Sequence, residues 1–183
     1  VLYNGETALE RLTFTVQPGD QVAIIGPNGA GKSTLIKTLL GFIRPSSGAV
    51  EIAIPRERIG YVAQNEAVDW NYPVTVQDVV MMGCARRIGW FRPPRREHWD
   101  FVHAALERVG MADLRQRQIG ELSGGQRRRA FIARALAQEA DLLLLDEPLN
   151  AVDAETRAII AAVLARLGEQ GKTVIAATHA LGR

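Results

Sequence analysis

The sequence predicts an α/β fold whose sheet is mainly parallel. Continuous apolar runs at Val22–Ile25, Leu142–Leu145 and Thr173–Thr178 are typical of strands that are buried on both faces. Helical patterns follow the first two runs, as expected where strands alternate with helices. In addition, a glycine-rich loop at residues 26–33 lies between the first run and a helical pattern at 33–40.

Composition bounds the class of protein. The chain has 183 residues, enough for one domain with a substantial core, and its net charge of +2 implies no nucleic-acid partner. Its single cysteine, Cys84, excludes an internal disulfide and fits a reducing compartment. No apolar run reaches the length of about 18 residues that a membrane-spanning helix needs. Because the chain stops at Arg183, shortly after an apolar run, we expect residues 1–183 to be one domain truncated at its C-terminus.

The N-terminal part is predicted to be an antiparallel β region. Apolar and polar residues alternate over 12–17, which is the period of a half-buried strand. A short strand is also predicted over 49–54, beyond the first helix and its expected C-cap, Gly41. The next strand, Ile59–Ala63, ends at Gln64, and strand ends of this kind bind ligands in open α/β sheets.

Helical patterns dominate residues 75–122, which we interpret as a helical insertion into the α/β core. An arginine-rich loop within it has two interpretations: a patch for nucleic acid or lipid headgroups, or a solvated loop beside a partner surface. The second is favoured because no aromatic residues alternate with the basic ones. His98 and His103 point apart on a helix, which disfavours a metal site, and Cys84 is expected to be a buried small residue. The arginines are Arg86, Arg87, Arg92, Arg95 and Arg96.

The glycine-rich loop fits the phosphate-binding pattern G-x-x-x-x-G-K-S. Phosphate oxygens need several backbone N–H groups at close range, and glycines leave room for that approach. The start of the following helix adds further donors and the positive end of its dipole. Lys32 is expected to bind the β- and γ-phosphates and Ser33 a Mg²⁺ ion; a mere glycine-rich turn is the disfavoured alternative. The predicted nucleotide-binding residues here are Gly26, Pro27, Asn28, Gly29, Ala30, Gly31, Lys32, Ser33 and Thr34.

A second anion-binding helix start is predicted at Leu122–Gln126. Ser123 is a good N-cap, and Gly124 and Gly125 clear the helix N-terminus for the approach of an anion. Taken alone, this pentapeptide fits a capped helix with a flexible entry at least as well, so both interpretations stay open at this point.

Two acidic residues follow the apolar run at 142–145. If that strand lies beside the phosphate loop, Asp146 can hold Mg²⁺ through water, and Glu147 can polarise an attacking water as general base. Two adjacent carboxylates in a cleft are costly unless a cation such as Mg²⁺ compensates them. His179 ends the last strand at the same edge as Lys32, which favours a functional role for this histidine over a structural one.

Together these residues resemble the nucleotide-binding domain of an ABC transporter, and the resemblance spans nearly the whole chain. The loop at 26–33 alone is shared with many NTPases. The signature at 122–126, which shortly precedes Asp146-Glu147-Pro148, is specific when Gln64 and His179 also stand in the family's order.

The resemblance implies a P-loop NTPase core, ATP and Mg²⁺ as cofactors, and a head-to-tail dimer that holds two ATP molecules between its subunits. Tyr3 would stack on adenine. Gln64 would contact Mg²⁺ and the attacking water and sense the permease, while His179 would take the switch position. The signature residues Ser123, Gly124, Gly125 and Gln126 would contact the ATP of the opposite subunit, the first three as a cap on its γ-phosphate.

This sequence departs from the family pattern at several positions. Asn150 and Val152 replace commoner residues in the D-loop at 150–153. Arg128 and Arg129 make the helix after the signature unusually basic, and Ala180 follows the switch histidine where an aspartate is usual.

A finer resemblance, to the ATPases of manganese, zinc or iron importers, rests on 68–76, 78–80, 82–83 and 89–91, in the region that contacts the permease. It implies a peripheral subunit at the cytoplasmic face of the cell membrane, bound to a permease, indirectly to a solute-binding protein, and to no nucleic acid. The alternatives are an ATPase for another solute, a soluble relative acting on DNA or ribosomes, and a regulator that only binds ATP. The lack of a coiled coil or second domain disfavours the soluble relative, and the presence of Glu147 and His179 disfavours the regulator.

Overall fold

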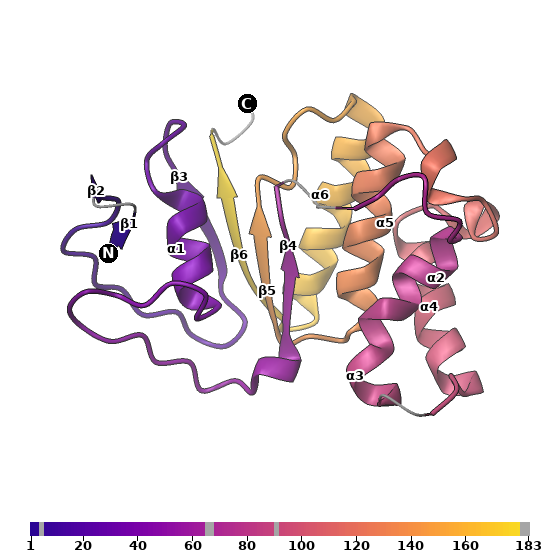
Figure 1. Ribbon diagram of the computed structural model, residues 1–183, viewed down its shortest axis with the longest axis horizontal. Helices are drawn as coiled ribbons and strands as arrows, with labels where there is room; N and C mark the ends of the chain where they lie inside the picture. Colours follow the sequence, from indigo (N-terminus) through magenta and orange to yellow (C-terminus); the bar gives the residue numbers. More distant parts are fainter. Residues whose placement is uncertain (4–5, 65–67, 90–91, 180–183) are drawn as a thin grey trace.

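The computed structural model describes residues 1–3, 6–64, 68–89 and 92–179. Four parallel strands form a sheet in the order β3-β6-β5-β4 (Figure 1). They are β3 (Gln21–Ile25), β4 (Ile59–Val62), β5 (Leu142–Asp146) and β6 (Thr173–Thr178). A separate antiparallel pair consists of β1 (Leu2–Tyr3) and β2 (Glu6–Thr7). The predicted α/β fold with a mainly parallel sheet is confirmed.

Helices cover both faces of this sheet, α1 (Lys32–Leu39) on one face and α5 (Gly124–Ala137) and α6 (Ala154–Glu169) on the other (Figure 1). Strand β5 is buried along its whole length, as expected for its unbroken apolar run. Leu142 and Leu144 pack in a cluster with Ile36 of α1, whereas Leu143 and Leu145 pack with residues of α5 and α6. β5 therefore contributes to both halves of the core, one on each face of the sheet. Each of its buried leucines contributes about 1.5–3 kcal/mol to the stability of the fold.

The segment at 75–122 packs α2 and α4 against α5. Thr75 forms a capping box with Asp78 and pairs with Gln118, which brings the two ends of the segment together. Cys84 is buried, as predicted, and burial raises the pKa of its thiol. That this segment is a separate subdomain stays a prediction. Its elements are α2 (Val76–Met81), η2 (Met82–Cys84), α3 (Ala85–Ile88), α4 (Arg96–Arg108), η3 (Ala112–Leu114) and η4 (Ile119–Glu121).

Two predicted strands are wrong: the structure has no strand at residues 12–17 or 49–54. Val16, Ile52 and Ile54 lie against the cluster under α1, whereas Leu12 and Phe14 are 52% and 45% exposed. The alternation at 12–17 therefore does not mark one buried side. A strand also needs a neighbour within hydrogen-bonding distance. Neither segment has one among the described residues.

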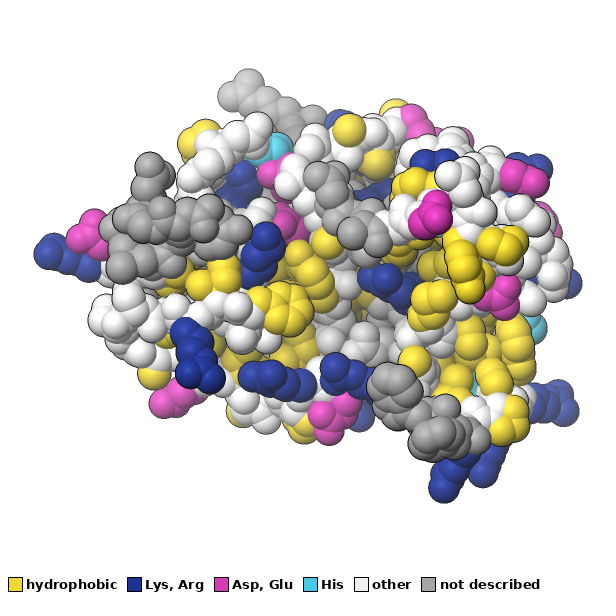
Figure 2. All heavy atoms as spheres, viewed as in Figure 1, with side chains coloured by type: hydrophobic (Ala, Val, Ile, Leu, Met, Phe, Trp, Pro, Cys, Tyr) yellow, Lys and Arg dark blue, Asp and Glu magenta, His cyan; other side chains and the backbone are white. Residues whose placement is uncertain are grey.

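Within the described ranges, no helix has the length and apolarity needed to cross a bilayer. Figure 2 shows lysine and arginine side chains along the lower edge of one face of the molecule, with acidic side chains among them. Charges of both signs therefore mix on this face.

Asp141 connects the amino ends of three neighbouring strands, β4, β5 and β6, through hydrogen bonds. It directly precedes β5, and its carboxylate accepts hydrogen bonds from Arg58, which ends the turn η1 (Arg56–Arg58) before β4, and from Lys172, before β6. The distances to Oδ1 are 2.7 Å from Arg58 Nη2 and 2.9 Å from Lys172 Nζ. The Arg58 fork and then Lys172 hold the pKa of this carboxyl well below its usual range. Since the side chain is 37% exposed, water screens both pairs.

We predict that Asp141→Asn lowers the free energy of unfolding at pH 7 by about 1 kcal/mol. A carboxyl with a depressed folded-state pKa stabilises the fold above its unfolded pKa and loses this contribution as the pH falls through the folded value. The deficit of the variant relative to the wild type should therefore shrink between about pH 5 and pH 2 in urea unfolding. Asp113→Asn, at an exposed aspartate of η3, is the control. A pH-independent deficit, or an equal one in the control, would contradict the prediction.

Candidate functional site

The predicted site residues meet at one edge of the sheet because each follows the carboxyl end of a parallel strand (Figure 1). The phosphate loop follows β3, Gln64 follows β4, Glu147 follows β5 and His179 follows β6. The prediction for Asp146 and Glu147 depended on β5 lying beside the loop. In fact β6 lies between β3 and β5, so the loop's neighbour in the sheet is the strand that carries His179.

The phosphate loop has the backbone that its glycines were expected to allow. Gly29 and Gly31 have positive φ angles of 80° and 84°, and α1 begins directly after Gly31. A Cβ atom on Gly31 would lie 2.5 Å from the carbonyl oxygen of Ala8, whereas one on Gly29 would meet nothing within 4 Å. Gly31 therefore accommodates the chain's own N-terminal segment, and Gly29 leaves open space beside the loop.

The side chain of Lys32 lies inside the site and is only 6% exposed. Its Nζ donates to the loop carbonyls of Gly26 (2.8 Å) and Pro27 (2.9 Å). It also lies 3.5 Å from Glu147 Oε1 and 3.4 Å from His179 Nδ1. An ammonium on a flexible stem can exchange such partners for phosphate oxygens while the loop backbone stays in place.

The Glu147 carboxylate has partners from several segments of the chain. Its carboxylate is 5% exposed, and a buried charge is costly without hydrogen bonds. His179 Nε2 lies 2.6 Å from Oε1, while Gln64 Nε2 (2.8 Å) and Asn150 Nδ2 (2.9 Å) donate to Oε2. The imidazole is best satisfied with its proton on Nε2 and with Nδ1 as an acceptor facing Lys32. A carboxylate held in this way can accept a proton from a water molecule that lies between it and a phosphate on the loop.

Asp146 has the properties of a cation ligand. It is 2% exposed, and its Oδ1 is buried without a hydrogen-bond partner among the described residues. Ser33, a second predicted ligand beside Gln64, is the second residue of α1 and lies next to Lys32 in the chain. Carboxylate and hydroxyl oxygens are donors that Mg²⁺ prefers, so these residues fit the ion. No cluster of three or more His, Cys, Asp or Glu side chains in the described part of the chain could hold a metal ion by itself.

Sequence reasoning missed the role of Arg128, which it treated only as an unusual charge. The guanidinium is buried and donates to the carbonyls of Asp146 (2.7 Å) and Glu147 (2.8 Å) from one nitrogen. From another it donates to the carbonyl of Ala63 at the end of β4 (2.5 Å). Arg128 thereby joins the carboxyl ends of β4 and β5 to α5. The position of an arginine one turn after the capped helix start was the available signal.

The two signature glycines differ in their surroundings. Ser123 caps α5 in a capping box with Gln126. A Cβ on Gly125 would lie 2.6 Å from Thr156 Oγ1 and 2.8 Å from Asp153 Oδ2, at the start of α6, whereas one on Gly124 would meet nothing within 4 Å. A backbone hydrogen bond from Thr156 lowers the pKa of Asp153, which caps α6. Gly125 thus serves helix packing, and Gly124 leaves the helix start open.

The structure does not place every predicted residue in this cluster. Tyr3 belongs to β1, but its side chain lies outside the described residues, as does Ala180. The carbonyl of Thr34 accepts a hydrogen bond from the Thr38 hydroxyl within α1 (2.7 Å). His98 is buried and accepts a backbone hydrogen bond at the start of α4.

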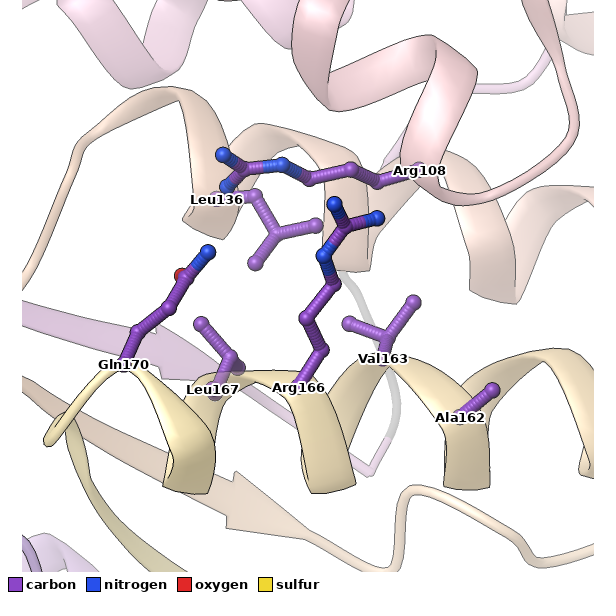
Figure 3. Close-up of a pocket in the computed structure, with 7 residues that line it drawn as sticks. All are labelled: Arg108, Leu136, Ala162, Val163, Arg166, Leu167 and Gln170. Carbon is purple, nitrogen blue, oxygen red and sulfur yellow. The ribbon is translucent and has the colours of Figure 1, made fainter.

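Figure 3 shows a cavity that lies away from these residues, between the helices on one face of the sheet. Apolar side chains form its floor and two arginine side chains lie over them. None of the predicted site residues lines it. Its lining consists of Arg108, Leu136, Ala162, Val163, Arg166, Leu167 and Gln170.

A family model described as ABC transporter matches residues 9–150. The chain is 47% identical to the chelated iron transport system membrane protein YfeB of Yersinia pestis, over 98% of this chain and 63% of that protein. It is 48% identical to the manganese transport system ATP-binding protein MntA of Synechocystis, over 97% of this chain and 71% of that protein. The chain thus spans less than two thirds of the first of these relatives.

Among solved structures, the fold resembles the dimeric, post-hydrolysis state of the ATP-binding cassette MJ0796 bound to ADP and Pi. The TM-score is 0.79 at 29% identity, over 94% of this chain and 80% of that one. Sequence and structure therefore point to the same family.

The signature glycines give a matched pair of variants. Gly125→Ala should lower the free energy of unfolding by about 1–3 kcal/mol, because its methyl group would overlap the cap of α6. Gly124→Ala should change it by less than about 1 kcal/mol, because the site is open. Chemical denaturation of both variants measures the difference, and equal losses would contradict the packing role assigned to Gly125.

Proposed function

Because the chain belongs to the ABC transporter family, we propose that it is the ATP-binding and ATP-hydrolysing subunit of a membrane transporter. One observation carries the proposal: Lys32 of the phosphate loop, the buried Glu147 and His179 converge, with Glu147 Oε1 3.5 Å from Lys32 Nζ and 2.6 Å from His179 Nε2. A nucleotide-binding loop, a base and a polar switch thus lie within reach of one phosphate group.

Each residue then has a role that its surroundings support. The backbone N–H groups of the loop and the start of α1 bind the β- and γ-phosphates, and Lys32 turns from the loop carbonyls to their oxygens. Glu147 accepts the proton of the attacking water, while His179 and Gln64 hold the carboxylate and the water in place. Ser33 and Asp146 would hold Mg²⁺, which would neutralise charge on the phosphates when bound. Tyr3 would stack on the adenine.

The active unit in this proposal is a head-to-tail dimer. Helices α1 and α5 lie on opposite faces of the sheet (Figure 1), so the phosphate loop and Ser123 and Gly124 precede or begin helices of different layers. The open helix start at Ser123 and Gly124 would cap the γ-phosphate held by a second copy. The dimeric state of the similar cassette bound to ADP and Pi supports this arrangement.

The transported solute in this proposal is a transition metal ion, namely manganese, zinc or iron. Support comes from two similar proteins, which are named for chelated-iron and manganese transport. The subunit would work at the cytoplasmic face of the membrane, bound to a permease that receives the ion from a solute-binding protein. Val68, Trp70 and Val74 pack against the core while Tyr72 is 61% exposed, which would place Tyr72 on the permease side. Trp90 and Phe91 lie outside the described residues.

Two variants test ATP binding and ATP hydrolysis separately. Lys32→Ala should lose ATP binding in calorimetric titration, because no other cation can take its place in the loop. Glu147→Gln should keep ATP binding, lose turnover and form an ATP-dependent dimer in size-exclusion chromatography, because only the base is removed. Unchanged affinity in Lys32→Ala would contradict the phosphate-loop assignment. A monomeric Glu147→Gln protein that binds ATP tightly would contradict the dimer.

The metal assignment is tested in cells. Deletion of the gene should lower cellular manganese, zinc or iron in elemental analysis. Expression of the wild-type protein should restore the metal, and expression of Lys32→Ala should not. Normal metal contents together with impaired uptake of a different solute would reject the metal and leave the ATPase proposal standing.

A further inference from the structure

The two oxygens of the Glu147 carboxylate have different partners. Oε1 faces Lys32 and His179, on the side of the phosphate loop. Oε2 faces two amide groups, those of Gln64 and Asn150, at 2.8 and 2.9 Å. Oε1 is therefore the oxygen turned towards the phosphates, and the amide donors fix which oxygen this is.

Asn150 reaches Oε2 from within the turn that carries Glu147 itself. The backbone N–H of Asn150 donates to the Glu147 carbonyl at 3.2 Å, which closes the turn. Glu147 has a φ of 52°, a left-handed conformation that costs free energy in a residue with a large side chain. The side chain of Asn150 then folds back onto the carboxylate. Asn150 and Glu147 are thus joined twice, by backbone and by side chain.

We propose that Asn150 is a positioning residue for Glu147, which it holds with Oε1 directed at the phosphate loop. This inference rests on the proposed ATPase function. The sequence marked Asn150 only as a departure from the family's usual D-loop residues, and the structure supplies its contact. An apolar side chain at this position could not donate a hydrogen bond to the carboxylate.

Gln64 and Asn150 share the same acceptor but differ in what else they can do. Gln64 lies at the end of another strand, β4, and is assigned a second task at Mg²⁺ and the attacking water. When it turns to that task, Oε2 loses one donor. Asn150 belongs to the turn of Glu147 and moves with it, so its hydrogen bond can persist throughout the reaction.

Other charged groups also surround Glu147 and are common to every variant compared below. Lys32 and His179 face its carboxylate, Asp146 precedes it in the chain, and Arg128 binds its carbonyl. These groups stay in place when Asn150 is replaced, so a change in kcat reports the loss of the Asn150 hydrogen bond.

The test compares ATP turnover of the purified wild-type protein with Asn150→Ala and Asn150→Asp. Asn150→Ala should lower kcat by about tenfold, since hydrogen bonds to charged groups are the stronger ones. The KM for ATP should stay within about twofold, because Asn150 does not contact the phosphate loop. Asn150→Asp, of the same shape, should lower kcat further because it sets a second carboxylate against Glu147.

Two controls separate positioning from folding. Gln170→Ala removes an exposed amide at the opposite end of α6 and should leave kcat unchanged. Thermal unfolding of all variants shows whether each is folded at the assay temperature.

Two results would overturn the inference, namely an unchanged kcat in Asn150→Ala and a loss confined to KM. If the wild type itself fails to hydrolyse ATP, the proposed function falls and the inference falls with it. If the wild type hydrolyses ATP and Asn150→Ala matches it, only the role of Asn150 is rejected.

Discussion

The burial of one carboxylate, that of Glu147, is the constraint on which the rest of the site depends. A charge with 5% exposure is costly unless its oxygens are paired, and no single segment supplies all of its partners. Lys32 comes from α1, His179 from the end of β6, Gln64 from the end of β4 and Asn150 from the turn after β5. A displacement of any strand end would leave the carboxylate short of a partner, so the charge and the register of the sheet depend on each other.

Arg128 extends this dependence to the signature helix. Its guanidinium donates hydrogen bonds to the carbonyls of Ala63, Asp146 and Glu147, at the ends of β4 and β5. Arg128 lies one turn into α5, whose first residues form the second predicted anion site. Arg128 therefore connects the first turn of α5 with the backbone of Asp146 and Glu147.

The sequence predicted the parts of the fold that repeat a simple physical pattern. The apolar runs of β5 and β6 and the capped helices α5 and α6 were located correctly because burial on both faces and cap residues leave local traces. The predicted strands at 12–17 and 49–54 were wrong because an apolar pattern does not show whether a segment has a partner strand. The site residues were predicted from motifs, whereas Arg128 and the Asn150 contact were not. The Arg128 contacts join segments far apart in the chain, which no local pattern encodes. The Asn150 contact is local, but it depends on the left-handed backbone of Glu147, which the motif does not reveal.

The glycines of the two predicted anion-binding motifs show that a glycine in a motif can serve packing instead of ligand binding. Each motif contains a glycine that the chain itself requires, Gly31 against Ala8 and Gly125 against the cap of α6. Each also contains a glycine with nothing within 4 Å, Gly29 and Gly124. Only the second kind marks space into which a phosphate can enter, because a Cβ on the first kind would collide with protein before any ligand arrived. The glycine pattern alone cannot separate packing from binding, but the environment of each missing Cβ can.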